Sequence, residues 1–378
     1  MKSILTVGHS YVVGLNRRLA HEMAVAGAGQ WQVTAAAPRA YAGDLGRLEL
    51  SPVDGEACRV VPIDAHLDRS PHLMVYGGLW QLLRSQPWDV VHCWEEPYVA
   101  AAAQIASLAP SASRFVFATF QNLAKTYPPP FNWMERKVLR RADGWIAFGH
   151  TVHEAQSPRV AYRALPSRVI PPGVDTRAFR PDASARARIR ADRGWNEQTP
   201  VVGFAGRFVP EKGLSVLTAA LAQVSTPWRA IFVGGGPERA ALQAFSAAYP
   251  GRVSIASNVP HHEMPAYYAA MDVLCAPSQT TVRWREQFGR MLIEAMACGV
   301  PVVASRSGEI PHVVGDAGVL LPEADAAQWS AALTALLPDA AARRDLADRG
   351  LRRARTGFAW PTVARQHLEF FEELTVRR

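Results

Sequence analysis

The sequence contains very little lysine. Only four of its 41 Lys and Arg residues are lysine (Lys2, Lys125, Lys137 and Lys212), so the formal net charge of +8 rests almost wholly on arginine, as codon bias in a GC-rich genome would produce. Residues 1–172 carry 17 basic and 13 acidic side chains and the rest of the chain carries 24 and 20, so the excess is spread evenly. Since no helix-turn-helix, zinc or RNA-binding motif accompanies it, we expect no nucleic-acid partner.

Long apolar runs are also missing. A membrane-spanning helix needs about 20 consecutive apolar residues, whereas the longest candidate, residues 98–109, is shorter and is interrupted by Gln104. The N-terminus lacks the apolar region and cleavage site of a secretory signal. The four cysteines form no C-x-x-C pair, which argues against zinc ribbons and thioredoxin-type chemistry and fits free thiols. We therefore expect a cytoplasmic protein.

Short apolar runs alternate with longer segments of helical periodicity. The strand candidates of the first half are residues 3–7, 32–36, 59–61, 90–93, 114–119, 144–147 and 168–170. Those of the second half are residues 201–205, 229–233, 253–255, 273–276, 301–304 and 318–320. Helical segments between them include residues 14–26, 133–141, 215–223 and 290–297. This alternation predicts parallel α/β sheets, and two series in tandem predict two Rossmann-like domains.

Pro171, Pro172 and Gly173 separate the two series. Proline fixes φ and glycine permits positive φ, so this tripeptide marks a turn or linker. We expect an N-terminal domain over residues 1–172 and a C-terminal domain over residues 173–359. The last helical segment, about 360–378, could pack on either domain by its sequence, and we expect it to return to the first.

The first candidate for a phosphate-binding loop follows the strand over 201–205. That strand ends at Gly206, and Arg207 and Lys212 then share one loop before the next helix. Ligands of α/β sheets bind at the carboxyl ends of strands, and helix N-termini there favour anions. Two cations in such a loop suit a diphosphate, because arginine offers a planar donor fork and lysine a mobile charge. Two solvated surface charges are the alternative.

Gly234, Gly235 and Gly236 follow the strand over 229–233. The G-x-G-x-x-G spacing of a dinucleotide fingerprint fails, because Arg239 takes the place of the third glycine. We interpret the segment as a tight turn that either lines a ligand cleft or is purely structural.

Two carboxylates, Glu286 and Glu294, lie on either side of a helix start predicted at Gly289. Glu286 then lies in the loop before the helix, and Glu294 lies about one and a half turns inside it at 3.6 residues per turn. A carboxylate on an otherwise apolar helix is costly unless it is paired or hydrogen-bonded, and sugar hydroxyls are suitable partners. A surface position for Glu294, or an ion pair with Arg207, is the alternative.

These motifs resemble those of the retaining glycosyltransferase family 4, which has the GT-B fold. The matching stretches are residues 206–207 with 211–213, residues 233–237, residues 277–278 with 286–294, residues 299–304, and residues 308–310 with Val313. The pair Glu286 and Glu294 resembles the E-(x)7-E signature of the family, and residues 172–175 resemble its interdomain strand end. The resemblance covers the second half of the chain and, more weakly, the first. It implies two Rossmann-like domains whose parallel sheets face each other across a deep cleft.

The resemblance also implies roles for individual residues. Arg207 and Lys212 would hold the donor diphosphate, Glu286 would contact the donor sugar, and Glu294 would bind the ribose of the nucleotide. The remaining donor contacts would come from the backbone, at Gly206, Val259, Gln287, Phe288 and Gly289.

The first half departs further from the family pattern. Of the Gly-Gly pair that often follows the first strand, only Gly14 remains to approach the donor phosphates. Many members carry a His where this chain has Gln121 and Asn122, which would instead position acceptor hydroxyls by hydrogen bonds. Glu95 and Glu96 follow another strand and would bind the acceptor, ordinary loop charges being the alternative.

The implied reaction moves a sugar from a UDP- or GDP-sugar to a hydroxyl of a saccharide or lipid-linked saccharide, with retention of configuration, as in polysaccharide biosynthesis. Charge develops on the leaving diphosphate, so fixed cations there stabilise the transition state most. Because Arg207 and Lys212 fill that role and no D-x-D motif occurs, we expect neither a metal ion nor a cofactor. The alternatives are an epimerase or phosphorylase on the same fold, and a non-catalytic basic binding protein.

Residues 127–141 place aromatic side chains beside basic ones. In the helix over 133–141, Arg136, Lys137, Arg140 and Arg141 fall on one side. A basic face next to exposed aromatics suits an anionic membrane surface, here the inner face of the membrane, where a lipid-linked acceptor would be met. A solvated helix with core aromatics is the alternative.

Overall fold

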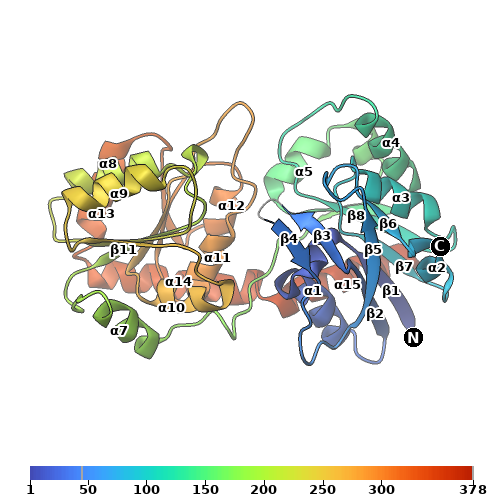
Figure 1. Ribbon diagram of the computed structural model, residues 1–378, viewed down its shortest axis with the longest axis horizontal. Helices are drawn as coiled ribbons and strands as arrows, with labels where there is room; N and C mark the ends of the chain where they lie inside the picture. Colours follow the sequence, from blue (N-terminus) through green and yellow to red (C-terminus); the bar gives the residue numbers. More distant parts are fainter. Residues whose placement is uncertain (44–45, 377–378) are drawn as a thin grey trace. The chain divides into compact units, whose positions relative to one another are not determined.

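The computed structural model describes residues 1–43 and 46–376, which form two compact units (Figure 1). The N-terminal unit contains residues 1–173 and the last helix, α15 (Trp360–Val376), and the C-terminal unit contains Val174–Ala359. The division after Gly173 lies one residue beyond the predicted position, and residues 377–378 of the predicted last helix lie outside the described part of the chain. In the described part, no helix combines the length and the apolar character needed to cross a bilayer.

An eight-stranded sheet forms the centre of the N-terminal unit, in the order β10-β9-β8-β7-β1-β2-β5-β6. The strands are β1 (Lys2–Val7), β2 (Trp31–Pro38), β5 (Arg59–His66), β6 (Val75–Gly77), β7 (Val90–Cys93), β8 (Arg114–Thr119), β9 (Gly144–Ala147) and β10 (Ser167–Val169). All neighbours are parallel except β5 and β6, and a separate antiparallel hairpin joins β3 (Ala40–Gly43) to β4 (Gly46–Glu49). The chain builds the sheet outward in both directions from β1, so the switch point lies between β1 and β7.

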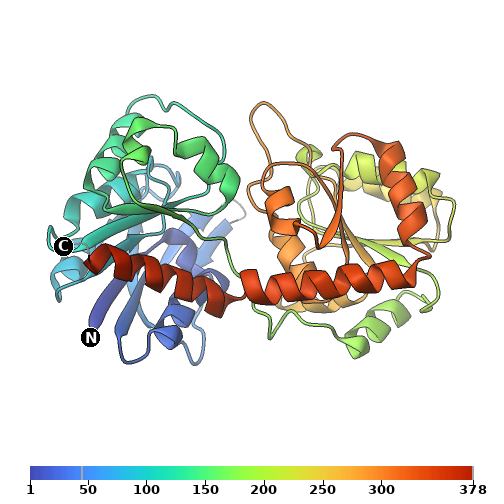
Figure 2. The same cartoon turned by 180° about the vertical axis from the view of Figure 1, so that it is seen from behind.

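Helices cover both faces of this sheet. Ile4 of β1 belongs to one core with α1 (Gly14–Ala26) and α15, whereas its neighbour Leu5 belongs to the other core with α2 (Leu79–Arg84), α3 (Ala100–Leu108) and α4 (Phe131–Arg141). Successive side chains of a strand point to opposite faces, which explains this division. Helix α15, dark red in Figure 2, packs against α1, so the last helix returns to the first unit as expected. Two short helices, α5 (His150–Gln156) and α6 (Val160–Arg163), complete the unit.

The C-terminal unit contains a parallel six-stranded sheet in the order β13-β12-β11-β14-β15-β16. The strands are β11 (Val201–Ala205), β12 (Arg229–Val233), β13 (Val253–Ala256), β14 (Val273–Ala276), β15 (Val302–Ser305) and β16 (Gly318–Leu321). This order corresponds to that of dinucleotide-binding folds, with its switch point between β11 and β14. The predicted pair of Rossmann-like domains is confirmed.

This sheet is also covered on both faces. One core contains residues of α7 (Ala183–Ala191), α10 (Met264–Ala269), α11 (Arg290–Ala297) and α12 (Ile310–Val314). The other contains residues of α8 (Leu214–Gln223), α9 (Arg239–Ala248) and α13 (Ala326–Leu336). Helix α14 (Ala340–Gly357) contributes to both. Since parallel sheets are buried on both faces, ligands are left with the ends of the strands.

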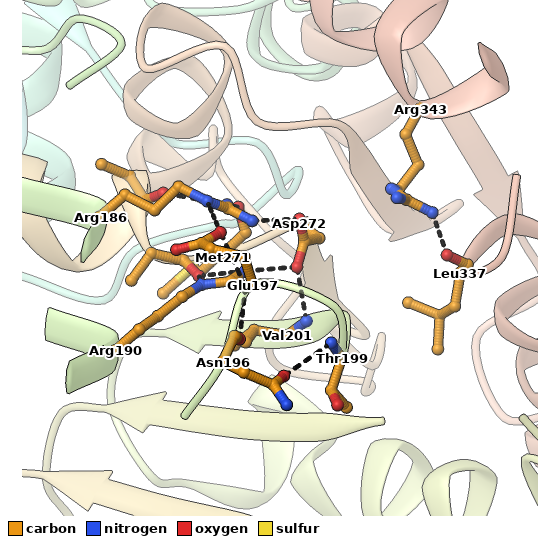
Figure 3. A network of polar contacts seen from close by, with 12 residues as sticks. Arg186, Arg190, Asn196, Glu197, Thr199, Val201, Met271, Asp272, Leu337 and Arg343 are labelled. Atoms are coloured by element: carbon orange, nitrogen blue, oxygen red, sulfur yellow. Dashed lines mark hydrogen bonds and ion pairs between the residues drawn. The ribbon is translucent and has the colours of Figure 1, made fainter. Parts of the chain in front are cut away.

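A network of polar contacts lies at the amino ends of β11 and β14 (Figure 3). Arg186 and Arg190 of α7 both bind the carboxylate of Asp272, the residue before β14, and Asp272 also accepts the N–H of Val201 at 2.7 Å. On α14, Arg343 donates to the carbonyl of Leu337. Arg186 and Arg190 are paired with Asp272, so these two arginines hold α7 to the sheet.

Candidate functional site

The switch point of the C-terminal sheet brings together two residues predicted to bind the donor. Lys212 ends a short 3-10 turn (η2, Pro210–Lys212) after β11, and its Nζ lies 2.5 Å from Oε2 of Glu286. The two side chains are mostly buried, with 13% and 7% of their surface exposed. Ser278, after β14, donates from Oγ to the same Oε2 at 2.8 Å. Because an ammonium group has three donors, Lys212 keeps hydrogen-bonding capacity beyond Glu286.

Close backbone packing fixes the loops that carry this pair. Gly213 has φ +68°, and a Cβ there would lie 1.9 Å from the carbonyl oxygen of Pro277. Gly308 has φ +50°, and a Cβ there would lie 2.0 Å from the carbonyl oxygen of Glu286, which also accepts the N–H of Glu309 at 3.0 Å. Both positions therefore require glycine, which explains the glycines of the predicted motifs by packing.

Glu294 lies inside α11 and is buried, with 7% of the residue exposed. Its Oε1 lies 2.9 Å from Nε2 of His261, and its Oε2 accepts the hydroxyl of Tyr268 at 2.9 Å. Burial, together with the neighbouring carboxylate, raises the pKa of Tyr268, so this tyrosine stays a donor. The structure thus excludes a surface position for Glu294. Its buried charge is stabilised by hydrogen bonds, as a carboxylate on an apolar helix requires.

The other predicted donor residues differ in exposure. The side chains of Arg207 and Gln287 are exposed. Phe288 is buried in the core, with its ring 5.8 Å from that of Phe358, so only its backbone is available to a ligand. Gly289 caps α11 with φ +80°. The half-buried Val259 packs against the core of the C-terminal unit.

The turn of three glycines after β12 packs against the loop after β11. Gly234 and Gly236 have φ +148° and +149°, and a Cβ on them would lie 1.9 Å from the carbonyl oxygen of Gly206 and 2.5 Å from that of Phe208. At Gly235 a Cβ would meet nothing within 4 Å. The turn therefore supports the backbone between Gly206 and Phe208.

Glu95 lies at the switch point of the N-terminal sheet, after β7, and is buried with 4% exposed. Its Oε1 accepts the N–H of His9 at 2.6 Å and the hydroxyl of Tyr76, and its Oε2 lies 2.6 Å from Nδ1 of His9. The Glu95 carboxylate raises the pKa of His9, and burial raises that of Tyr76. Glu95 is therefore a fixed member of a polar cluster, and the alternative of an ordinary loop charge is wrong.

Glu96 faces the neighbouring strand β8. Its Oε2 accepts the hydroxyl of Thr119 at 2.6 Å, its Oε1 accepts the N–H of Phe120 at 2.7 Å, and burial raises its pKa to about 7. Both carboxylates line a cavity of about 310 Å³, which we call the N-terminal cavity. Its walls are formed mainly by His9, Trp94, Glu95, Glu96, Tyr98 and Phe120.

Two further residues predicted to bind the acceptor lie elsewhere. Gln121 donates from Nε2 to the hydroxyl of Tyr127 at 3.1 Å, and Asn122 is buried with 2% exposed. Neither is among the residues that line the N-terminal cavity. Gly14, predicted to approach the donor, begins α1 in the N-terminal unit, and its N–H donates to Oγ of Ser51 at 3.2 Å.

Three of the four basic residues predicted on one side of helix α4 are exposed. Trp133 is 62% exposed, and Arg136, Lys137 and Arg140 are exposed as well. Trp133 is therefore not a core aromatic. Arg141 instead donates to the carbonyls of Pro110 and Ser113 at 2.7 and 2.8 Å, so its assignment to the free basic face is wrong.

The residues of these clusters to which sequence reasoning gave no role include His9, Ser278, His261 and Tyr268, as well as Tyr76 and Thr119. Ser278 and His9 each follow a strand at a switch point, and this position could have identified them. His261 and Tyr268 have no such signal, because they meet Glu294 through packing of η3 (His261–Glu263) and α10 on α11.

Profiles of two protein families match the chain. "Glycosyl transferases group 1" matches residues 185–353, and "Glycosyltransferase Family 4" matches residues 15–178. A D-inositol 3-phosphate glycosyltransferase of Xylanimonas cellulosilytica is 31% identical over 362 residues, which cover 89% of this chain and 81% of the relative. A GDP-mannose-dependent alpha-(1-6)-phosphatidylinositol monomannoside mannosyltransferase of Mycolicibacterium smegmatis is 34% identical over 264 residues, which cover 66% of this chain and 68% of the relative.

Solved structures share the fold over the whole chain. Sucrose-phosphate synthase from Thermosynechococcus elongatus superimposes with a TM-score of 0.75 at 23% identity, covering 100% of both chains. HepE of Anabaena, in a complex with UDP and glucose, superimposes with a TM-score of 0.73 at 20% identity, covering 99% of this chain and 100% of that one. At these identities the likeness concerns the fold.

Proposed function

Since this chain belongs to the family 4 glycosyltransferases of the GT-B fold, we propose that it transfers a sugar from a UDP- or GDP-sugar to a hydroxyl of a saccharide or lipid-linked saccharide, with retention of configuration. The observation that carries this proposal is the pair of Lys212 and Glu286 at the switch point, where α/β sheets bind their ligands. The relative named for GDP-mannose and the fold neighbour solved with UDP support a nucleotide donor.

In the proposed reaction, the bond between the anomeric carbon and the donor diphosphate breaks, and a bond from that carbon to the acceptor oxygen forms. The acceptor proton passes to the departing phosphate oxygen. Lys212 and Arg207 would stabilise the negative charge that develops on the diphosphate. Glu286 would accept hydroxyls of the donor sugar, with Lys212 and Ser278 orienting its carboxylate.

Glu294 would bind the two ribose hydroxyls of the nucleotide. Tyr268 fixes one of its oxygens and His261 the other, so the carboxylate is held in one orientation before a ligand arrives. Hydrogen bonds to an ionised group are about twice as strong as neutral ones. A pre-oriented Glu294 is therefore a suitable partner for vicinal hydroxyls.

We propose further that the reaction needs no metal ion and no cofactor. The support is in the sequence, which has no D-x-D motif but places Arg207 and Lys212 in one loop. Adding EDTA or Mg²⁺ to the transfer reaction should leave the rate unchanged, and a rate restored only by a divalent ion would refute this part of the proposal.

A thermal-shift screen with UDP- and GDP-sugars tests the donor. A ligand at 100 times its dissociation constant stabilises the folded state by about 2.7 kcal/mol. The donor found in this way is then offered to saccharide acceptors, and NMR of the product reports the anomeric configuration. An inverted product would refute retention, whereas isomerised donor or transfer to inorganic phosphate would point to the epimerase or phosphorylase.

We also propose that the exposed face of α4 contacts an anionic membrane through Trp133, Arg136, Lys137 and Arg140. Each basic side chain near an anionic surface contributes about 1 kcal/mol. Flotation with vesicles of phosphatidylglycerol and phosphatidylcholine at low and high salt tests this. Binding at low salt that is lost in Lys137→Ala/Arg140→Ala supports the contact, and no binding at either salt refutes it.

A further inference from the structure

The N-terminal cavity has the features of a small-molecule site. It lies at the carboxyl ends of β1, β7 and β8, at the switch point of the sheet, and its volume of about 310 Å³ is at the lower end of the range for such sites. Its residues all belong to the N-terminal unit. A site of this size has room for a ring the size of a monosaccharide rather than for a long chain.

Aromatic rings form much of the wall, and their positions are fixed by stacking. Phe120 lies against Phe148 with ring centroids 3.7 Å apart, and Tyr98 lies against Tyr127 at 4.2 Å. Trp94 packs on Phe148 from another side at 4.6 Å. The face of an aromatic ring is electronegative and attracts polarised C–H groups. One face of a sugar or cyclic polyol presents such C–H groups, so these walls fit a ring of that kind.

The acidic groups of the cavity are two carboxyl groups, of which Glu95 is paired with His9 and Glu96 has a pKa of about 7. Glu95 and Glu96 both line it, and no Lys or Arg occurs among the lining residues of the described chain. His9 and His72 also line the cavity, and Nδ1 of His9 lies 2.6 Å from Oε2 of Glu95, which pairs with any charge on that ring. Carboxylates accept hydrogen bonds from hydroxyl groups. A phosphate group would meet largely aromatic walls there and none of the cationic forks that normally bind it.

We propose that the N-terminal cavity binds an uncharged sugar or cyclic polyol ring of the acceptor and discriminates against the same ring carrying a phosphate. The proposal rests on the proposed function in one respect, namely that the bound ring is the acceptor. It names the class of acceptor, an unphosphorylated ring held between aromatic faces and two carboxylates. In a lipid-linked saccharide, the terminal sugar would enter the cavity and the lipid phosphate would stay outside.

Matched pairs of rings test the discrimination with the full chain and no donor. The pairs are glucose and glucose 6-phosphate, mannose and mannose 6-phosphate, galactose and galactose 6-phosphate, and myo-inositol and D-inositol 3-phosphate. Binding is measured by saturation-transfer NMR and titration. At least one uncharged ring should bind, and its phosphate should bind at least tenfold more weakly. A phosphate that binds as tightly as its ring, or a panel in which no uncharged ring binds, would overturn the proposal.

Variants identify the cavity as the site of binding. At pH 8, above the pKa of about 7 of Glu96, Glu96→Gln keeps the shape but removes a negative charge, so the discrimination against the phosphate should fall at least threefold. Glu154→Gln, an exposed carboxylate on α5, is the matched control and should change nothing. Tyr98→Ala removes a wall and should weaken both members of a pair equally. Binding that is unchanged in both cavity variants overturns the proposal, and a thermal melt shows that each variant is folded.

The outcomes also separate this inference from the proposed function. Donor binding depends on Lys212 in the C-terminal unit and is measured independently by thermal shift. A chain that binds uncharged rings but transfers no sugar would contradict the proposed function and leave the cavity assignment standing. A chain that transfers sugar to a phosphorylated acceptor in preference to the uncharged ring would contradict the cavity assignment and leave the function standing.

Discussion

Removing the ammonium of Lys212 should separate catalysis from stability. In Lys212→Met the stem remains, but Glu286, 7% exposed, loses its cationic partner and keeps the hydroxyl of Ser278 at 2.8 Å. Breaking a fully buried ion pair costs about 3–5 kcal/mol. Because Lys212 itself is 13% exposed, we expect about 2–3 kcal/mol of lost stability. Loss of a group that stabilises transition-state charge should lower the transfer rate about 100- to 1,000-fold.

The double variant Lys212→Met/Glu286→Gln distinguishes the two effects. It removes the negative charge of Glu286 along with the cation, so we expect it to recover most of the thermal stability lost in Lys212→Met. The transfer rate should stay low, because Arg207 alone would remain to stabilise the charge on the diphosphate. Arg344→Ala, at an exposed position of α14, is the control for loss of a positive charge in the same unit. A rate for Lys212→Met within about threefold of the wild type would refute the assignment of Lys212.

Three further changes test other parts of the molecule. Gly236→Ala should lower the melting temperature and Gly235→Ala should not, because a Cβ at 236 would lie 2.5 Å from the carbonyl oxygen of Phe208 and one at 235 would meet nothing within 4 Å; equal melting temperatures would contradict the packing argument. Glu294→Gln should weaken binding of UDP or GDP about tenfold in titration calorimetry, since hydrogen bonds to a charged group contribute about 1.5–3 kcal/mol, and unchanged affinity would exclude Glu294 from the nucleotide site. Glu96 keeps its proton in the folded chain up to about pH 7 and in the unfolded chain only to about 4.5, so its contribution to stability is present below pH 4.5 and is lost as the pH rises through 7. In urea unfolding, the free energy of unfolding of Glu96→Gln should therefore rise relative to that of the wild type as the pH goes from about 4.5 to 7, by up to about 3 kcal/mol. A difference in unfolding free energy that does not vary with pH would contradict the raised pKa.

Sequence reasoning identified the strands with buried apolar runs, and it also identified β10, β13 and β16, which are only partly buried. Strands β7, β8, β11 and β12 have the predicted bounds, and each is buried along nearly its whole length. Strand β6, by contrast, was missed, since its three residues form an antiparallel edge with no apolar period to detect. The hairpin of β3 and β4 has no fully buried position in its strands and gave no signal either. Apolar periodicity in a sequence reflects burial of the strand, so exposed strands at the edge of a sheet give a weak signal.

The site was predictable as a set of residues but not as a set of contacts. The spacing of Glu286 and Glu294 drew attention to both carboxylates, yet it could not show that they have different partners. Lys212 reaches Glu286 across 74 positions of sequence, and Glu95 meets His9 across 86. Such pairs depend on which strands become neighbours, and strand order is a property of the whole sheet rather than of any local pattern.

The side chains at the two switch points suit different ligands of a sugar-transfer reaction. Around Lys212 the C-terminal unit offers a cation that a carboxylate and a hydroxyl hold in place, which suits a group that leaves as an anion. At Glu95 and Glu96 the N-terminal unit offers carboxylates among aromatic rings, which suits an uncharged hydroxyl-bearing ring. The same fold is thus used twice with different side chains at the switch point. Since no Lys or Arg lines the N-terminal cavity, a released nucleotide would lack the cations that bind a diphosphate and would compete poorly with the acceptor for that site.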